Sequence, residues 1–390
     1  MVFSKFFHLP AVEVRLVSCY TAHTTRLRGG IRMRRSLSRI LPAAAAAALL
    51  LALTACAGAA EARSVERQFL AMDTVMSLAL YGGAANGAAQ SAVSELQRLE
   101  DLLSRTRPES TVSRLNESGG MDCGPELWEL LRAASSYSET TGGAFDITVA
   151  PLMDAWGFTG EAPRVPEDGE LQGLLDRVGR ERVELLPDGK SVKLAEGTEL
   201  DLGAAAKGYA ADRLASLFAR EGVERGWASL GGNVLAWGTR PDGDPWRIGI
   251  QDPRYPDQQR FVGVLGLEDG FAVTSGSYQR YFEQNGVTYH HILNPADGKP
   301  ARSGLVSVTV VAPADREAPG EGPGNGTMCD ALSTALFVMG EEKALDFWRS
   351  GQYDFQLVLV TEDGRVAATS GLEGVFIPEE GSGYRYETVS

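Results

Sequence analysis

The run D-L-G-A-A-A-K-G-Y-A-A-D, residues 201–212, constrains the fold more than any other segment of the chain. It begins with a carboxylate, continues with small residues that let another backbone approach closely, and then has Lys207 and the pattern of a helix start. A turn with a purely structural role rarely combines all of these features. The run therefore predicts a helix that begins at a site for an anionic ligand.

The first 55 residues have the pattern of a targeting segment. Four arginines precede an apolar stretch at 40–53, which ends in Leu53-Thr54-Ala55-Cys56. The stretch is short for a transmembrane span, and this order is typical of a secretory signal. A cysteine after Leu-Thr-Ala resembles a bacterial lipobox, in which Cys56 would become the diacylated first residue of the mature protein. The alternative is an ordinary signal cleaved nearby. Residues 1–30 fit neither role, and initiation at Met33 would give a signal of more usual length.

Removal of this segment leaves a strongly acidic protein. The whole chain has 37 Lys and Arg against 51 Asp and Glu. Residues 1–55 hold eight of the basic and one of the acidic residues, so 29 remain against 50, a net charge of −21. This charge argues against nucleic-acid binding and against electrostatic attachment to anionic lipids. Membrane attachment would depend on the two acyl chains.

The cysteines give no support for a zinc site or a redox dithiol. Cys19 lies in the leader and Cys56 is the lipidation candidate, which leaves Cys123 and Cys329. Outside the cytoplasm these two could form a disulfide, but the sequence does not show whether they are close, and the unpaired state is favoured. The chain has no C-x-x-C, no H-E-x-x-H and no cluster of cysteine and histidine.

Patterned segments predict an α+β protein without the regularity of a doubly wound sheet. Helices are expected at 88–104, 125–140, 208–221 and 330–339. Strand patterns lie at 182–186, 191–194, 246–250, 305–311, 355–360 and 365–369. No G-x-G-x-x-G follows a strand and no G-x-x-x-x-G-K-[ST] occurs, so the standard nucleotide-binding loops are absent.

The helix expected to begin at Asp330 carries the first candidate for chemistry. Asp330 and Thr334 are four residues apart and Ser333 is three from the aspartate, so a helix brings their oxygens to one side. Such hard oxygen ligands suit Mg²⁺, which keeps waters and completes its shell with ligand phosphates. The alternative is a helix cap, in which the aspartate only accepts from backbone amides, and a helix N-terminus also repels cations.

Two of the four histidines stand together in His290-His291-Ile292-Leu293-Asn294-Pro295. Neighbouring residues of an extended segment point to opposite faces, so one of the two is expected to reach a given site. A neutral imidazole can accept a hydroxyl proton, which makes one histidine a candidate general base. The alternative is a histidine hydrogen-bonded for structure.

Glycine-containing turns supply the remaining candidates. The turn Thr141-Gly142-Gly143-Ala144-Phe145-Asp146 presents an aromatic ring and a carboxylate together, and 231–233 and 274–276 are similar turns of small residues. Each is a weak signal alone because glycine turns are common. Phe145 alone would be expected to pack in the core.

Together and in this order, these segments resemble the ApbE family of FAD:protein FMN transferases. The resemblance covers the chain from Phe69 to the C-terminal strands. It is carried by M-D-T at 72–74, residues 110–116, T-G-G-A-F-D-I-T-V-A-P-L at 141–152 with Trp156-Gly157, the run at 201–212, S-L-G-G-N at 229–233, T-S-G-S-Y at 274–278, H-H-I-L-N-P at 290–295 and D-A-L-S-T-A-L at 330–336. It implies one α+β domain of mixed sheets and packed helices, related to the T-fold, at 68–390. The leader at 1–55 and a lipidated tether at 56–67 would precede this domain.

The resemblance also implies an activity and a set of site residues. The family binds FAD with Mg²⁺ and transfers the FMN half to a threonine or serine of a partner protein, with release of AMP. The flavin site would be lined by Met72, Ala144, Phe145, Asp146, Asp201, Lys207 and Ile292. The metal would be held by Asp330, Thr334 and the carbonyl of Ala204, with Ser333 where some members have a second carboxylate, and the catalytic histidine would be His291. The expected acceptor is an extracytoplasmic flavoprotein subunit of a membrane redox complex.

The chain departs from the family pattern at two positions. Thr106 is nearest to the position where members often have a tyrosine over the flavin, and Asp297 replaces a more usual threonine before Gly298.

Two alternative functions are compatible with the same residues. If water replaced the acceptor hydroxyl, the protein would be an FAD pyrophosphatase that yields FMN and AMP. The other alternative, a flavin-binding lipoprotein without catalysis, is disfavoured by the presence of Asp330, Thr334 and His291. No convincing copy of the acceptor pattern occurs, so self-flavinylation is not expected.

Overall fold

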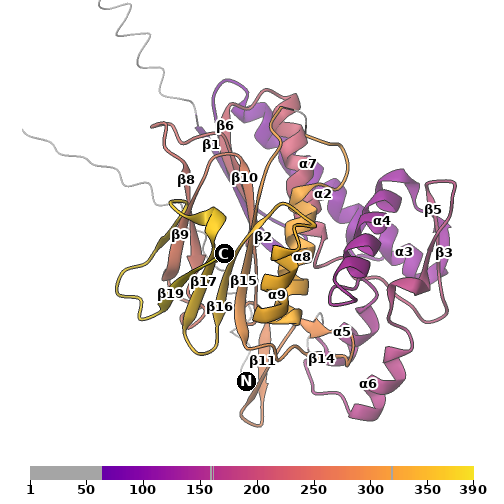
Figure 1. The fold of residues 1–390 in the computed structure, drawn as a ribbon. Coiled ribbons are helices and arrows are strands. Elements are labelled where there is room, and N and C mark those ends of the chain that lie inside the picture. The colour runs from indigo at the N-terminus through magenta and orange to yellow at the C-terminus, as the bar shows by residue number, and fades with distance from the viewer. Residues whose placement is uncertain (1–63, 159, 161, 318) are drawn as a thin grey trace, which may run out of the picture. The chain divides into compact units, whose positions relative to one another are not determined.

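Nine strands form the large sheet on which the other elements are built (Figure 1). The computed structural model describes residues 64–390 except 159, 161 and 318. The strand order is β1 (Ser64–Ala71), β2 (Thr74–Tyr81), β6 (Arg225–Leu230), β7 (Asn233–Trp237), β10 (Gly270–Gly276), β15 (Leu305–Pro313), β16 (Gln356–Thr361), β17 (Arg365–Thr369) and β19 (Arg385–Val389). Neighbouring strands are antiparallel except β17 and β19, which are parallel. Most other elements are insertions between strands that are neighbours in this sheet.

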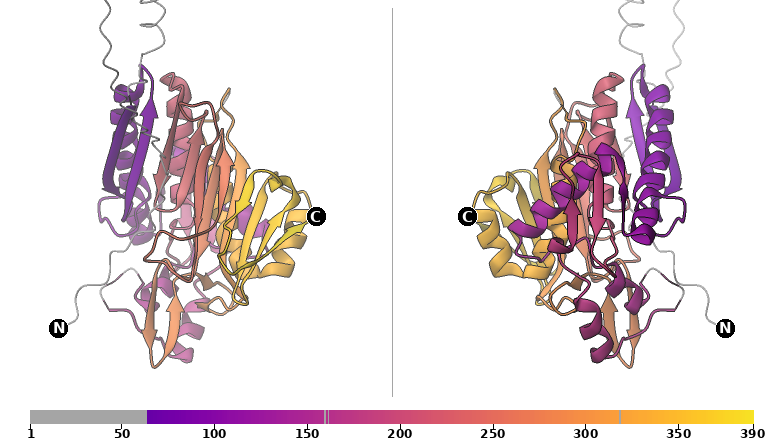
Figure 2. Two further views of the ribbon diagram at one scale, coloured as in Figure 1. Left: turned by 90° about the vertical axis from the view of Figure 1, so that its left-hand side faces the viewer. Right: turned by 90° about the vertical axis from the view of Figure 1, so that its right-hand side faces the viewer.

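Helices cover one face of the large sheet (Figure 2). They are α2 (Ala85–Leu103), α7 (Ala206–Arg220), α8 (Asn325–Met339) and α9 (Glu341–Arg349). Helix α8 packs on β10 and β15, and α7 contacts both α2 and α8. Most residues of α8 are buried, as expected for a helix that is apolar nearly all round and has neighbours on several sides.

A second sheet covers the opposite face. It has the order β18 (Phe376–Pro378), β9 (Phe261–Leu267) and β8 (Trp246–Gln251). Its buried side chains, among them Trp246 and Leu265, form a separate apolar core with residues of the large sheet such as Val358. The Trp246 ring is fully buried and lies 5.8 Å from the ring of Tyr81. The large sheet is therefore enclosed by a helical layer on one face and a sheet layer on the other.

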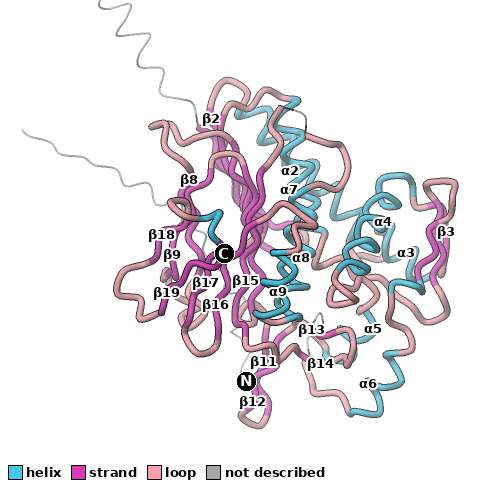
Figure 3. Tube along the Cα trace, in the orientation of Figure 1, coloured by secondary structure: helices cyan, strands magenta, loops and turns pink. Residues whose placement is uncertain are grey.

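Two further groups of helices and strands lie outside these three layers (Figure 3). One group contains α3 (Thr111–Ser118), β3 (Gly120–Asp122), α4 (Gly124–Thr140), β4 (Val183–Leu185) and β5 (Ser191–Leu194). The other contains α5 (Ala150–Trp156), α6 (Asp168–Leu175), β11 (Tyr281–Gln284), β12 (Val287–His290), β13 (Leu293–Asn294) and β14 (Lys299–Pro300). The rings of Trp156, Phe158, Phe282 and Tyr289 pack with centroid separations of 5.3 to 6.3 Å. This aromatic contact fixes the β11–β12 hairpin against the end of α5.

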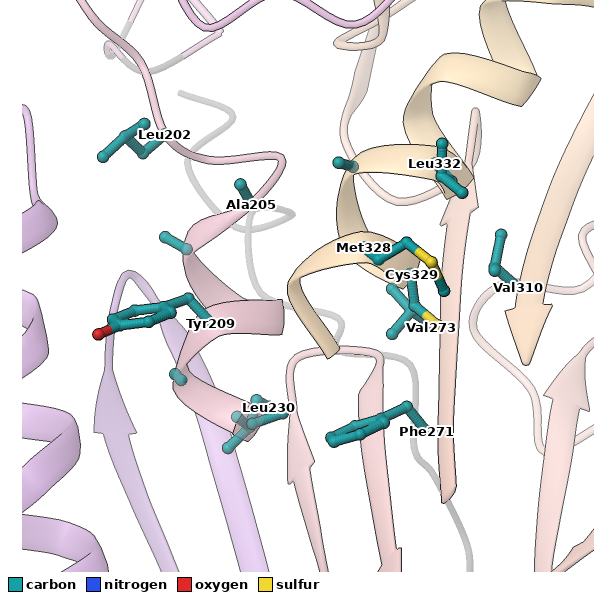
Figure 4. Close-up of a cluster of buried hydrophobic side chains, with 14 of the residues drawn as sticks. Leu202, Ala205, Tyr209, Leu230, Phe271, Val273, Val310, Met328, Cys329 and Leu332 are labelled. Atoms are coloured by element: carbon teal, nitrogen blue, oxygen red, sulfur yellow. The ribbon is translucent and has the colours of Figure 1, made fainter. Parts of the chain in front are cut away.

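Helices α7 and α8 cross at two glycines. A Cβ atom on Gly208 would lie 2.2 Å from the carbonyl oxygen of Gly326, and a Cβ atom on Gly326 would lie 2.6 Å from that of Gly208. Because no side chain fits at either position, the two backbones can touch. Figure 4 shows the apolar cluster beside the crossing, which includes Tyr209 of α7, Cys329 of α8 and Phe271 of β10.

A carboxylate on α7 holds the beginning of α8 in place. Asp212 accepts hydrogen bonds from the amides of Gly324 (2.8 Å), Gly326 (2.7 Å) and Thr327 (2.8 Å) and from the Thr327 hydroxyl (2.6 Å). Burial raises the pKa of Asp212 to about 6, although these hydrogen bonds act in the opposite direction. The first-turn amides of α8 are thus satisfied by a neighbouring helix instead of by a residue of its own.

The α+β class is confirmed, and the expected helices and strands all occur, most with ends shifted by a few residues. The largest shift is in α8, which begins at Asn325 and not at Asp330, so Asp330 lies in the second turn and is not a cap. Strand β1 begins at Ser64, so residues 64–67, which the sequence assigned to a tether, lie in the sheet. Cys123 and Cys329 are buried free thiols, as favoured above.

The leader and Cys56 lie outside the described residues. Within 64–390, apart from the three gaps, no helix combines the length and the apolar character needed to cross a bilayer.

The contact at the helix crossing can be tested by adding one methyl group. We expect Gly208→Ala to lower the free energy of unfolding by about 1–3 kcal/mol, because its Cβ would overlap the backbone of α8. The control is Gly87→Ala in α2, where a Cβ meets nothing within 4 Å and alanine improves helix propensity by up to about 1 kcal/mol. Urea denaturation of both variants measures the difference. Equal stability of the two variants would show that the helices do not touch as described.

Candidate active site

Oxygen atoms from α8 and β10 meet beside the helix crossing. The carboxylate of Asp330 is buried, and its Oδ2 accepts the amide of Gly208 on α7 at 2.8 Å. The hydroxyl of Ser275, at the end of β10, lies 2.8 Å from the Ser333 hydroxyl and 3.1 Å from the Thr334 hydroxyl. Ser333 also donates to the carbonyl of Asp330 at 2.9 Å and is fully buried. The structure therefore brings the hydroxyls of Ser275, Ser333 and Thr334 together, about one turn along α8 from the Asp330 carboxylate. We call the side-chain oxygens of these four residues the oxygen cluster. The sequence had placed Ser275 only in a small-residue turn.

The segment before α7 is shaped by Asp201. Its Oδ1 accepts the Gly203 amide at 2.8 Å, and its own amide donates to the carbonyl of Ile147 at 2.7 Å. Lys207, in the first turn of α7, donates from Nζ to the carbonyl of Gly203 at 3.0 Å. Ala204 lies within this turn. Asp201 and Lys207 thus make side-chain contacts with the turn at Ala204, which lies one helical turn before the Gly208 amide that the α8 carboxylate accepts.

The two neighbouring histidines have different surroundings. The His290 ring is buried, with Nε2 3.0 Å from the carbonyl of Ala301 and Nδ1 accepting the Ile292 amide at 3.3 Å. The Nδ1 of His291 lies 3.2 Å from the carbonyl of Arg280. A carbonyl can only accept, so Nδ1 of His291 carries the proton and Nε2 keeps its lone pair. Burial and the positive charge of Arg280 lower the pKa of His291 to about 3, so the ring is neutral at neutral pH.

Met72 and Asp73 form the turn between β1 and β2, with φ angles of +49° and +56°. Two-residue turns with positive φ at both positions normally contain glycine or asparagine, so these side chains cost on the order of 1 kcal/mol each. The Met72 amide donates to Glu100 Oε1 at 3.0 Å, and Nη2 of Arg280 lies 3.5 Å from the carbonyl of Asp73. Strain of this kind concentrates at functional sites. Arg280 connects the turn with the segment that carries His291.

The turn at 141–146 packs mostly inward. The Phe145 ring is buried and meets Tyr137 edge to face, with centroids 6.5 Å apart. Asp146 accepts the amide and hydroxyl of Thr148 at 2.8 and 2.5 Å, and burial raises the pKa of its carboxyl. The Phe145 ring therefore belongs to the core, while Ala144 and Asp146 remain partly exposed.

Two residues that support the site were missed at the sequence level. Arg105 donates from Nε to Asp201 Oδ2 at 2.8 Å and from Nη2 to Asp154 Oδ1 at 2.6 Å. Asn116 donates to the Leu200 carbonyl at 3.0 Å and accepts the Leu200 amide at 2.8 Å. Asn116 lies in the motif at 110–116, and an asparagine at the end of that motif could have suggested a backbone clamp. No local signal indicated a partner for Arg105, because its carboxylates are distant in sequence.

A cavity of about 430 Å³ lies near this region. Its lining includes Trp156 of α5 and, from the region around the histidine segment, Tyr289, Asn294 and Arg302. None of the predicted site residues lines it. The cavity is therefore separate from the oxygen cluster and from His291.

A family model, sequence relatives and solved structures all match the chain to the same family. The model of the ApbE family matches residues 72–359. The FAD:protein FMN transferase of Treponema pallidum (strain Nichols) is 31% identical over 346 residues, 83% of this chain and 92% of the relative. The FAD:protein FMN transferase of Klebsiella pneumoniae (strain 342) is 34% identical over 296 residues, 74% of this chain and 87% of the relative.

Solved structures agree with the sequence matches. The ApbE protein of Thermotoga maritima superposes with a TM-score of 0.72 and 33% identity, over 80% of this chain and 99% of that one. The flavin transferase ApbE of Vibrio cholerae superposes with a TM-score of 0.68 and 28% identity, over 80% and 99% of the two chains. These similarities show that the chain belongs to the ApbE family, as an enzyme related to known flavin transferases.

Proposed function

We propose that the chain catalyses the Mg²⁺-dependent transfer of the FMN part of FAD to a threonine or serine hydroxyl of an acceptor flavoprotein, with release of AMP. The names of the matched relatives support the reaction class. The observation that carries the proposal is the hydrogen bond from Nδ1 of His291 to the Arg280 carbonyl, which leaves Nε2 with its lone pair. We further propose that His291 and the run at 201–212 contribute to the same site.

We propose that FAD binds near the beginning of α7, in a site lined by Met72, Ala144, Phe145, Asp146, Asp201, Lys207 and Ile292. Phe145 and Ile292 are buried, so they would contribute shape and backbone atoms. Lys207 supplies a positive charge either to the pyrophosphate or to the flavin ring.

The oxygen cluster fits Mg²⁺ by its chemistry. Asp330, Thr334 and the carbonyl of Ala204 offer hard oxygens, and the described residues contain no group of three or more His, Cys, Asp and Glu that could hold a metal by themselves. A cation held by one carboxylate needs waters and ligand phosphates to complete its shell. The pyrophosphate of FAD would provide the phosphate oxygens. When bound there, Mg²⁺ would offset the negative charge of the pyrophosphate. The Ser333 hydroxyl, which is hydrogen-bonded to Ser275, would hold the neighbouring side chains of this cluster in place.

His291 would accept the proton of the incoming hydroxyl. The hydroxyl oxygen forms a bond to the phosphorus of the FMN phosphate, and the bond between that phosphorus and the bridging oxygen breaks. AMP leaves with the bonding electron pair, and the hydroxyl proton passes to Nε2 of His291. Hydrogen bonding of Nδ1 to the Arg280 carbonyl keeps the ring in the orientation and tautomer that this transfer needs.

We also propose that the enzyme is an extracytoplasmic lipoprotein anchored through Cys56. The support is the Leu-Thr-Ala-Cys sequence after the apolar stretch at 40–53. Strand β1 begins at Ser64, so the anchor would hold the enzyme close to the membrane surface. Such a position favours an acceptor that is an extracytoplasmic flavoprotein subunit of a membrane redox complex.

The anchor is tested by substitution of the cysteine. In a bacterial host with the lipoprotein pathway, the unaltered chain should incorporate labelled palmitate and fractionate with membranes. Cys56→Ser should incorporate none and move to the soluble fraction. Equal labelling of the two chains would contradict the anchor.

The catalytic assignments are tested by two substitutions. We expect His291→Ala and Asp330→Ala each to reduce FMN transfer at least about a thousandfold, because one removes the base and the other the carboxylate of the metal set. Asp346→Ala, an exposed aspartate on α9, is the control and should keep full activity. Mass spectrometry of a candidate acceptor incubated with FAD and Mg²⁺ measures the transfer, and circular dichroism checks the fold.

The same assay separates the possible reactions. A gain of FMN mass on the acceptor supports the transferase, whereas AMP release without any acceptor indicates hydrolysis of FAD. Full transfer activity in a folded His291→Ala or Asp330→Ala protein would contradict the assignment of that residue.

A further inference from the structure

Arg105 is clamped between carboxylates of two separate elements. It follows the end of α2, and only 10% of its side chain is exposed. Its Nε donates to Asp201 Oδ2 at 2.8 Å, while Nη2 and Nη1 donate to the two oxygens of Asp154 on α5 at 2.6 and 3.3 Å. A planar guanidinium suits this arrangement, because its donors point in fixed directions toward both partners.

The backbone around Arg105 is fixed as well. The Ser104 hydroxyl accepts the amides of Thr106 and Arg107 at 3.2 Å each, and the Ser104 carbonyl accepts the hydroxyls of Ser110 and Ser113. The hydrogen-bonded turn thus holds the backbone of Arg105 in a position from which its side chain reaches Asp201.

Asp201 transmits this contact to the proposed ligand site. One of its oxygens accepts from Arg105 and the other accepts the Gly203 amide, so both are engaged. The second hydrogen bond holds the turn that carries Ala204 and leads into Lys207, together with the amides of Ala205 and Ala206, which donate to the Leu202 carbonyl at 2.9 and 2.8 Å. We therefore expect a change at the Asp201 carboxylate to shift the Ala204 carbonyl.

The charge of Arg105 matters for an anionic ligand. Asp201 is 15% exposed, and without the guanidinium it would be a largely buried, uncompensated carboxylate. Such a charge in the turn before α7 would weaken the attraction of the helix start for phosphate groups and would favour a rearranged turn. The ion pair with Arg105 opposes both effects.

We propose that Arg105 is a positioning residue of the FAD site, which holds Asp201 and through it the turn at Ala204. This inference rests on the proposed function, because it assigns Arg105 to the binding of the same FAD. It differs from a purely structural connection between α2 and α5, because it requires an effect on FAD affinity that exceeds any effect on stability or on the chemical step.

The test uses three arginine variants of the full chain. Arg105→Met removes the charge but keeps the length, and Arg105→Lys keeps the charge but cannot bridge both carboxylates. Arg132→Met is the control, because Arg132 is an exposed arginine of α4 that pairs with Glu129 on the same helix. Equilibrium dialysis with FAD and Mg²⁺ gives the dissociation constant, and transfer assays give KM for FAD and kcat.

We expect Arg105→Met to raise the FAD dissociation constant and KM about tenfold, with kcat at saturating FAD changed less than about twofold. Arg105→Lys should fall between this variant and the unaltered protein, and Arg132→Met should match the unaltered protein. An unchanged FAD dissociation constant in Arg105→Met overturns the proposal, and so does a loss confined to kcat.

A second variant decides the matter if Arg105→Met does not fold. Asp154→Asn removes the charged anchor on α5 at a half-exposed position, and we expect a smaller rise in the FAD dissociation constant. No rise in that variant then overturns the proposal. Failure of the proposed function would appear differently, as an unaltered protein that binds FAD but transfers no FMN.

Discussion

Direct contact between the backbones of α7 and α8 sets the distance between the beginning of α7 and the Asp330 carboxylate on α8. Gly208 and Gly326 leave no room for a side chain between the helices, and Asp212 accepts four hydrogen bonds from the first turn of α8. At this separation the amide of Gly208 reaches the carboxylate of Asp330. A wider crossing would separate the beginning of α7, with its lysine and alanine carbonyl, from the oxygens of α8.

Other contacts position the turn before α7 and the segment that carries His291. The turn before α7 is held by Asp201, which is paired with Arg105 and hydrogen-bonded to the backbone at Ile147. On the other side, Arg280 accepts a hydrogen bond from His291 through its carbonyl and reaches the strained turn at Asp73 with its side chain. The site is therefore built from loops that rigid helices and strands hold in place, which is the usual way to position reacting groups.

The sequence predicted the helices and strands better than the tertiary contacts between them. Periodic apolar residues and turn sequences located α2, α4, β5 and β17 because these signals are local. The start of α8 was misplaced by five residues because its cap, Asp212, comes from another helix. The partners of Arg105 and the bridging role of Ser275 depend on tertiary contacts, so no spacing in the chain could have indicated them. The residues alone left the choice between the two histidines open, and the family resemblance pointed to His291. In the structure, the ring of His290 is used internally at both nitrogens.

We propose that one cation-dependent site for FAD forms where α7 meets α8. The dissociation constant of FAD, measured with Mg²⁺ and with chelator for the unaltered protein and for Asp330→Asn, tests this site. We expect Mg²⁺ to tighten FAD binding about tenfold or more in the unaltered protein and to have no effect in the variant. An equal effect of Mg²⁺ on both proteins would contradict it, because the cation would then be held elsewhere.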